Sequence, residues 1–173
     1  AFPRAKGMLY DPGIGTALIV RAPLREGRSG VAVSELISSI DIAPTLLEAA
    51  GLSVPESIQG RSFLGLLTGR RYERRECVFS EKNYHDSYDP IRSIRTPRHK
   101  YLRNFEERPK IICATDIKRS SASDEMWPWA HEARPAEELY DLESDPWEME
   151  NLAGRAEHAA LQADLGRRLA EWM

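Results

Sequence analysis

Lys6 is the N-terminal side chain whose type and setting most directly suggest chemistry. It stands in a Gly- and Pro-rich stretch that leads into the apolar run Ala17–Val20, which is closed by Pro23. A short apolar run bounded by turn residues is typical of a strand buried on both faces. A cation on the loop before such a strand is suited to binding an anion. The alternative is an ordinary solvated lysine, because most lysines are exposed.

A second group of candidate residues is a set of cations around a predicted hairpin: Arg92, Arg95, Arg98, Lys100 and Arg103. Tyr101 and Phe105 are interleaved with them, a combination that also occurs in modules that bind nucleic acid or sulfated glycans. The net charge of the chain is -3, and its C-terminal half supplies acidic partners. We therefore expect a salt-bridged or solvated face, with a non-catalytic glycan- or nucleic-acid-binding module as the alternative.

The remaining candidates for ligand chemistry are weaker. Cys77 and Cys113 are far apart, and neither belongs to a Cys-x-x-Cys pair. They predict neither a zinc site nor a disulfide framework, although one disulfide between them remains open. Arg61 is expected to bind nearby loop carbonyls through its side chain, with ligand binding as the alternative.

Length and composition favour one globular domain, or one domain with part of another. The chain has 173 residues, of which 42% are hydrophobic and 29% charged. No stretch approaches the roughly 18 apolar residues that a membrane span needs, and no signal-peptide pattern is present. The small net charge excludes a global field that would recruit nucleic acid or anionic membranes.

The first half of the chain is predicted to contain two helices. In the stretch Asp41–Gly51, apolar residues recur at helical spacing between a good N-cap and a glycine stop. This helix is expected to pack on a core through Ile42, Leu46, Leu47 and Ala50. A short helix is predicted from Ser62 to Gly69. The charged residues 70–76 then predict a boundary between residues 1–75 and 76–173.

The second half is predicted to form a small antiparallel sheet and a C-terminal helix. Strands are expected at residues 77–80, 91–95, 101–105 and 138–142, the middle two forming a hairpin. Residues 106–136, which include Trp127-Pro128-Trp129, have little pattern and predict a long ordered loop of a kind that is often functional. Residues 157–173 predict a helix that packs on the sheet through Leu161, Leu165, Leu169 and Trp172.

Three phrases, in this order, resemble the sulfatases of the alkaline-phosphatase superfamily. The first is Lys6-Gly7-x-x-Tyr10-x-x-Gly13. The second is Asp41-Ile42-Ala43-Pro44-Thr45-Leu46-Leu47 with Ala50-Gly51, leading to Gln59-Gly60-Arg61-Ser62. The third is Glu138-Leu139-Tyr140-Asp141-Leu142-x-x-Asp145-Pro146-x-Glu148-x-x-Asn151-Leu152. Phe2-Pro3 and Pro90-Ile91-Arg92-Ser93-Ile94 make the heparan N-sulfatase (sulfamidase) branch the most similar one.

The resemblance implies the C-terminal part of an alkaline-phosphatase-like α/β sulfatase fold. Residues 1–75 would end the large catalytic domain, and residues 76–173 would form a C-terminal α+β subdomain. The resemblance also implies hydrolysis of sulfate esters or sulfamates on sulfated small molecules or glycans. In the family, the nucleophile is a formylglycine made from a Cys/Ser-x-Pro-x-Arg motif, beside a divalent cation, calcium above all. An extracytoplasmic location is favoured by the family.

The sequence lacks the formylglycine motif and the family's N-terminal metal-binding aspartates. Neither cysteine is followed by the required proline and arginine. We therefore expect a fragment that begins just after an Asp-Asn or Asp-His metal-ligand pair, holds no metal and is inactive alone. Its partner would be the N-terminal part of the catalytic domain.

By the same resemblance, Lys6 is the sulfate-binding lysine, which contacts a sulfate oxygen and offsets charge developing on the leaving oxygen or nitrogen. His85 would bind sugar hydroxyls or donate a proton, with Glu81 and Asp86 as neighbouring substrate contacts. A surface-loop histidine is the alternative. Arg92 either forms a salt bridge between subdomains or binds an acidic group of a sugar.

One departure from the family concerns the loop after Lys6. Gly15-Thr16-Ala17 stands where many sulfatases have an Arg-Val-Pro-like phrase, so what anchors this loop is open, although the lysine is retained. A phosphodiesterase or phosphonate monoester hydrolase of the same superfamily is the alternative activity. Sulfate and phosphate are both tetrahedral oxyanions, which a lysine can bind equally.

Overall fold

The computed structural model describes residues 4–21, 27–112, 121 and 130–173. The chain divides into two compact units: unit 1 comprises Ala1–Ala17 and Phe79–Met173, and unit 2 comprises Leu18–Val78. The assignment of residues 1–75 to the end of a catalytic domain stays a prediction. Over the described ranges, no helix is both long and apolar enough to cross a bilayer.

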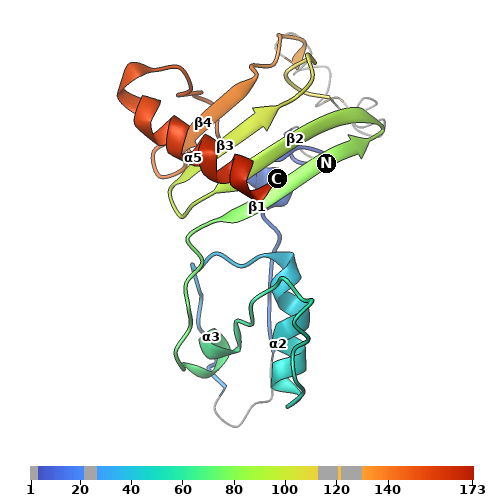
Figure 1. Ribbon diagram of the computed structural model, residues 1–173, viewed down its shortest axis with the longest axis vertical. Coiled ribbons are helices and arrows are strands. Elements are labelled where there is room, and N and C mark those ends of the chain that lie inside the picture. Colours follow the sequence, from blue (N-terminus) through green and yellow to red (C-terminus); the bar gives the residue numbers. More distant parts are fainter. Residues whose placement is uncertain (1–3, 22–26, 113–120, 122–129) are drawn as a thin grey trace. The chain divides into compact units, whose positions relative to one another are not determined.

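Unit 1 is built on a four-stranded sheet with the strand order β1-β2-β3-β4 (Figure 1). Its strands are β1 (Val78–His85), β2 (Ser87–Arg95), β3 (His99–Asn104) and β4 (Glu137–Asp141). The predicted hairpin is confirmed, since β2 and β3 are antiparallel with Ile94 opposite Tyr101. The turn between them is closed by the N–H of Thr96, which donates to the carbonyl of His99 at 2.8 Å.

The two faces of this sheet are covered by different parts of the chain (Figure 1). Helix α5 (Ala159–Trp172), preceded by the 3-10 turn η2 (Ala156–His158), packs on β2 and β3 and buries Leu165 and Leu169, as the apolar stripe predicts. Residues 4–14, including the short helix α1 (Asp11–Ile14), cover the other face. There, one buried cluster contains Met8, Leu9, Tyr10, Ile91, Leu102 and Tyr140.

The long excursion after β3 is ordered at its base. The N–H of Lys110 donates to the carbonyl of Glu132 at 2.7 Å, and Pro109 forms a β-bridge with Ala133. These contacts concern only the described ends of the predicted loop, so its order as a whole stays a prediction. Trp127-Pro128-Trp129 lie outside the described residues.

Unit 2 contains both predicted helices. After the 3-10 turn η1 (Ser39–Asp41) come α2 (Ile42–Ala49) and α3 (Leu64–Thr68), which ends at Gly69 with a φ of 72°. The carboxylate of Asp41 does not cap α2. It accepts hydrogen bonds from the main-chain N–H groups of Ser38 and Arg61 and forms an ion pair with Arg75. The predicted side-chain role of Arg61 stays a prediction.

Two expectations for unit 2 are wrong. Residues 17–20 are irregular rather than a strand, and Ile19 is 93% exposed. A strand buried on both faces needs hydrogen-bonded neighbours, and no strand of the described residues lies beside this run. Helix α2 likewise exposes Leu46 and Ile42, so its apolar stripe covers no core within the described part of the chain.

Candidate functional site

Lys6 lies in a tight turn formed by residues 4–7. The N–H of Met8 donates to the carbonyl of Ala5 at 3.1 Å, and Gly7 has a φ of 76°, a left-handed conformation that favours glycine. Lys6 is exposed, whereas the three residues from Met8 to Tyr10 are buried. The turn therefore carries an exposed ammonium group directly beside a buried segment.

Arg4 anchors the beginning of this turn. Its side chain donates to the carbonyl of Glu148 at 2.5 Å, and its guanidinium lies 3.8 Å from the centroid of the Tyr10 ring. The cation–π contact stabilises this arrangement because only 8% of Arg4 is exposed. An arginine thus anchors the loop from before Lys6, rather than from the position after it where many sulfatases have one.

Tyr10 anchors the segment after the turn through the buried carboxylate of Glu138. The hydroxyl of Tyr10 donates to Glu138 at 2.8 Å, that of Tyr140 donates at 2.5 Å, and the side-chain amide of Asn104 donates at 2.7 Å. Burial raises the pKa of both tyrosines, and the negative charge of Glu138 raises it further. Both hydroxyls therefore remain donors throughout the physiological range.

Asp11, which is half-buried, is held by a second set of charges. Its carboxylate lies 2.9 Å from the ammonium of Lys100 and 3.0 Å from the guanidinium of Arg95. Lys100, which is fully buried, also lies 3.1 Å from the buried carboxylate of Glu148. Burial opposes ionisation of Asp11, but Lys100 and Arg95 outweigh it and hold its pKa below the usual range. Burial raises the pKa of Glu148, although Lys100 opposes this shift.

Strand β1 reaches the Lys6 turn through Lys82 and His85. The ammonium of Lys82 donates to the carbonyl of Gly7 at 2.7 Å and forms an ion pair with Asp89. Asp89 is fully buried and also pairs with Arg134. A Cβ atom on Gly7 would lie 3.3 Å from Cγ and Nδ1 of His85, so the imidazole lies directly against the turn.

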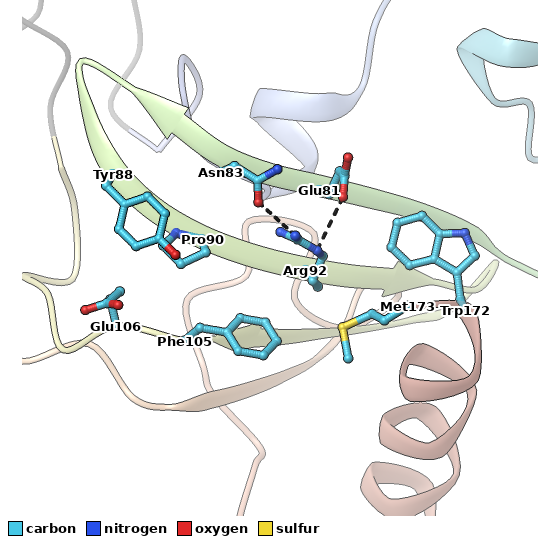
Figure 2. Close-up of a pocket in the computed structure, with 9 residues that line it drawn as sticks. All are labelled: Glu81, Asn83, Tyr88, Pro90, Arg92, Phe105, Glu106, Trp172 and Met173. Atoms are coloured by element: carbon cyan, nitrogen blue, oxygen red, sulfur yellow. Dashed lines mark hydrogen bonds and ion pairs between the residues drawn. The ribbon is translucent and has the colours of Figure 1, made fainter.

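The five predicted site residues do not gather in one place. Lys6 and His85 come together, and Asp86 forms the turn after His85 with a φ of 59°. Glu81 and Arg92 lie on the face that carries α5, because successive residues of a strand point to opposite faces and Lys82 faces the N-terminal segment. Their ion pair, with Nε and Oε2 3.4 Å apart, lines the pocket of Figure 2.

This pocket has a volume of about 430 Å³ and lies over β1 and β2 beside the end of α5 (Figure 2). Arg92 is fixed within it by a hydrogen bond of 2.8 Å to the side chain of Asn83. Exposed aromatic rings of Tyr88, Phe105 and Trp172 complete its wall. Trp172 is held by stacking on Phe79, with the ring centroids 4.8 Å apart.

The cations of the hairpin are largely engaged within the chain. Ion pairs hold Arg92, Arg95, Arg98 and Lys100, and the guanidinium of Arg103 lies 5.1 Å from the ring centroid of Phe105. These contacts confirm the prediction of a salt-bridged face.

Among the described residues, the cysteine and acidic side chains form no recognisable metal centre. Cys77 is a free, half-buried thiol, and Cys113 lies outside the described residues. Within the part of the chain that the structure describes, no group of three or more His, Cys, Asp or Glu side chains is placed to hold a metal ion.

Several residues that position the Lys6 turn were not identified from the sequence: Arg4, Lys82, Asp89, Arg134, Glu138 and Glu148. One usable signal exists for Asp89, which precedes Ile91 and Ser93 at the spacing of one strand face. A charged residue in register with buried strand positions predicts a buried ion pair, since an unpaired charge is rarely buried.

Comparisons with known proteins agree on the family. Residues 4–123 match the family model described as N-sulphoglucosamine sulphohydrolase, C-terminal. An ulvan-active sulfatase of Formosa agariphila is 32% identical over 99% of this chain and 30% of its own length. Human N-sulphoglucosamine sulphohydrolase is 27% identical over 99% of this chain and 39% of its own length. The chain therefore spans well under half of these curated relatives.

Solved structures with a similar fold include a sulfatase and a phosphonate monoester hydrolase. A phosphonate monoester hydrolase from Silicibacter pomeroyi has a TM-score of 0.67 and 25% identity, and the match covers 96% of this chain and 30% of that one. A 2-O GAG sulfatase has a TM-score of 0.54 and 27% identity, with coverage of 76% and 23%. The family match, the motifs and the fold together show that this chain belongs to the sulfatases of the alkaline-phosphatase superfamily, in the N-sulphoglucosamine sulphohydrolase-like branch.

Proposed function

We propose that this chain is the substrate-side part of a sulfatase that hydrolyses sulfate esters or sulfamates, and that Lys6 binds a sulfate oxygen. One observation carries the proposal. The exposed lysine stands on a turn that Arg4 anchors to the main chain of Glu148, and that Tyr10 and Asp11 anchor to the sheet, with the imidazole of His85 against it. A preorganised cation of this kind stabilises charge that develops during reaction without having to reorganise.

In sulfate ester hydrolysis, the bond from sulfur to the leaving oxygen breaks, and negative charge develops on that oxygen. Lys6 would offset this charge, and His85 would donate a proton to the leaving atom or bind a neighbouring sugar hydroxyl. Glu81, Asp86 and Arg92 stay candidate substrate contacts. The ion pair of Glu81 and Arg92 lies on the other sheet face, so their contact with the same substrate group is the weaker part of the proposal.

The nucleophile and the metal are proposed to come from the N-terminal part of the catalytic domain. The described residues do not fit a metal centre, so no step is assigned to a metal here. Unit 2 exposes several large apolar side chains, and we propose that they pack against that part of the domain. They include Leu18, Ile19, Val20, Ile42, Leu46 and Leu52.

The test compares this chain with the full-length parent on an aryl sulfate in the presence of calcium. The parent should turn over the substrate, and Lys6→Ala in it should lower kcat by about 10²- to 10³-fold, the loss typical of one oxyanion-stabilising group. Lys110→Ala is a matched control, because Lys110 pairs with Glu132 on the surface. Rapid turnover by this chain alone would sink the proposal that it lacks the nucleophile.

Phosphonate monoester or phosphodiester hydrolysis is the second candidate activity. It is favoured by the likeness to the Silicibacter pomeroyi enzyme, which extends over 96% of this chain. The parent's kcat/KM for an aryl sulfate should exceed that for the matching aryl phosphonate. The reverse order would assign the phosphonate activity instead.

A further inference from the structure

Lys82 makes the sheet's direct contact with the main chain of the Lys6 turn. Its ammonium donates to the carbonyl of Gly7, the residue next to Lys6, at 2.7 Å. The side chain of Lys82 is only 8% exposed, so the bond is shielded from water. A hydrogen bond from a charged donor in such a setting is among the stronger ones in proteins.

Lys82 is itself held in one position. Its partner Asp89 is fully buried and binds Lys82 and Arg134 at once, and the side chain of Arg134 is fully buried as well. Burial opposes ionisation of Asp89, but Arg134 and Lys82 outweigh it and hold its pKa below the usual range. The three groups therefore form a fixed support beneath the turn, with two cations on one carboxylate.

The turn is confined from two directions at the same residue. Lys82 holds the carbonyl of Gly7, and the ring of His85 lies 3.3 Å from where a Cβ atom on Gly7 would stand. Gly7 also has a φ of 76°, a conformation that other residues rarely adopt. Because Lys6 is bonded directly to Gly7, a movement of Gly7 would change the direction in which the Lys6 side chain leaves the turn.

We infer that Lys82, supported by Asp89 and Arg134, is a positioning residue for Lys6: it fixes the Gly7 peptide and thereby the place of the Lys6 ammonium. Lys82 touches the turn and not the substrate. Because this role presupposes that Lys6 binds sulfate, it rests on the proposed function. A misplacement of about 1 Å can reduce catalysis by about 100-fold, so the effect on rate is measurable.

The first test is Lys82→Met in the full-length protein, with Lys110→Met as the matched control. Lys82→Met should lower kcat by about 10- to 100-fold. The loss should be larger for phenyl sulfate than for nitrophenyl sulfate, because the poorer leaving group depends more on Lys6. Lys110→Met should match the wild type. A uniform loss across leaving groups would indicate a merely structural role and overturn the inference.

The second test is whether Lys82 acts through Lys6. The double variant Lys6→Ala/Lys82→Met should be no slower than Lys6→Ala alone, whereas independent roles would multiply the two losses. Gly7→Ala leaves Lys82 intact but places a Cβ atom 3.3 Å from the His85 ring at a φ of 76°. Like Lys82→Met, it should lower kcat more for phenyl sulfate than for nitrophenyl sulfate. It replaces Lys82→Met as the test if that variant fails to fold.

Failure of the inference and failure of the proposed function are distinguishable. A full-length wild-type protein that turns over neither sulfate esters nor sulfamates defeats the proposed function. Hydrogen exchange then decides the inference, because Lys82→Met must speed exchange of the Met8 amide, which is bonded to Ala5. Unchanged exchange overturns it. A fully active Lys82→Met enzyme overturns the inference while leaving the proposed function in place.

Discussion

Replacing Lys100 by methionine probes the buried charges that anchor the Lys6 turn. Lys100 lies in β3, is fully buried, and contacts the carboxylates of Asp11 at 2.9 Å and Glu148 at 3.1 Å. Methionine fills a similar volume but leaves the buried Glu148 carboxylate without its cation, while the main-chain N–H of Asp11 still donates to it at 2.6 Å.

The expected loss is set by the charge that is left behind. Removing one partner of a buried ion pair typically lowers the free energy of unfolding by about 3–5 kcal/mol. The Coulomb attraction across 3 Å, at an effective dielectric constant of about 20, is of similar size, about 5 kcal/mol. We therefore expect Lys100→Met to destabilise unit 1 by about 3–5 kcal/mol near neutral pH.

The loss should depend on pH in a defined direction. The folded-state pKa of Asp11 is lowered, so its stabilising contribution is present above its usual pKa and disappears as the pH falls through the folded value. The folded-state pKa of Glu148 is raised, so in the variant this group relieves its buried charge by protonation as the pH falls. The difference between wild type and variant should therefore shrink on acidification.

The assay is urea unfolding followed by tryptophan fluorescence at about pH 7 and about pH 4.5. Lys110→Met is the matched control, and its loss should stay below about 0.5 kcal/mol because its ion pair is on the surface. Lys100→Met/Glu148→Gln should recover part of the stability. The reasoning is refuted if Lys100→Met costs less than about 1 kcal/mol near neutral pH, or the same at both pH values.

Two further predictions concern unit 2. Gly60→Ala would place a Cβ atom 2.0 Å from the carbonyl oxygen of Ile40, so the loop must move. Hydrogen exchange should then show a loss of protection around Ile40. Unchanged protection would contradict the close contact. Burial opposes ionisation of Asp41, but Arg75 and two main-chain N–H groups hold its pKa below the usual range. Asp41→Asn should therefore lower Tm near neutral pH, and the difference in Tm between wild type and variant should shrink as the pH falls through the folded-state pKa of Asp41. A difference in Tm that grows on acidification would contradict this prediction.

The sheet and the helix α5 could be predicted because the apolar face of each is buried against another element of the described chain. The helical spacing of Leu165 and Leu169 predicts one apolar face, and the strands supply the surface that buries it. Ile19 and Leu46 show the limit of this reasoning. Their apolar patterns are just as clear, but a pattern predicts that a face will be covered and does not say which part of a protein covers it.

The sequence predicts Lys6 as a candidate site residue, but it does not predict the residues that hold the Lys6 turn in place. Lys6 follows from a motif, whereas the contact between Lys82 and Gly7 joins residues 75 positions apart and leaves no local pattern. The position of Glu81 was missed for a related reason. The strand predicted from residue 77 ended at residue 80, before Glu81, so the alternation of faces along the real strand β1 could not be used.

The order of segments in unit 1 has a consequence for how the protein folds. Residues 4–14 pack on a sheet whose strands all come after unit 2, so about 60 intervening residues form a loop that must be closed. Closure of such a loop costs about 3.5 kcal/mol of chain entropy, so the hairpin β2–β3, which closes locally, is expected to form first. The sheet then serves as a template, and the segment that carries Lys6 docks late. Kinetically, the candidate site would be the last part of unit 1 to assemble and the first to open.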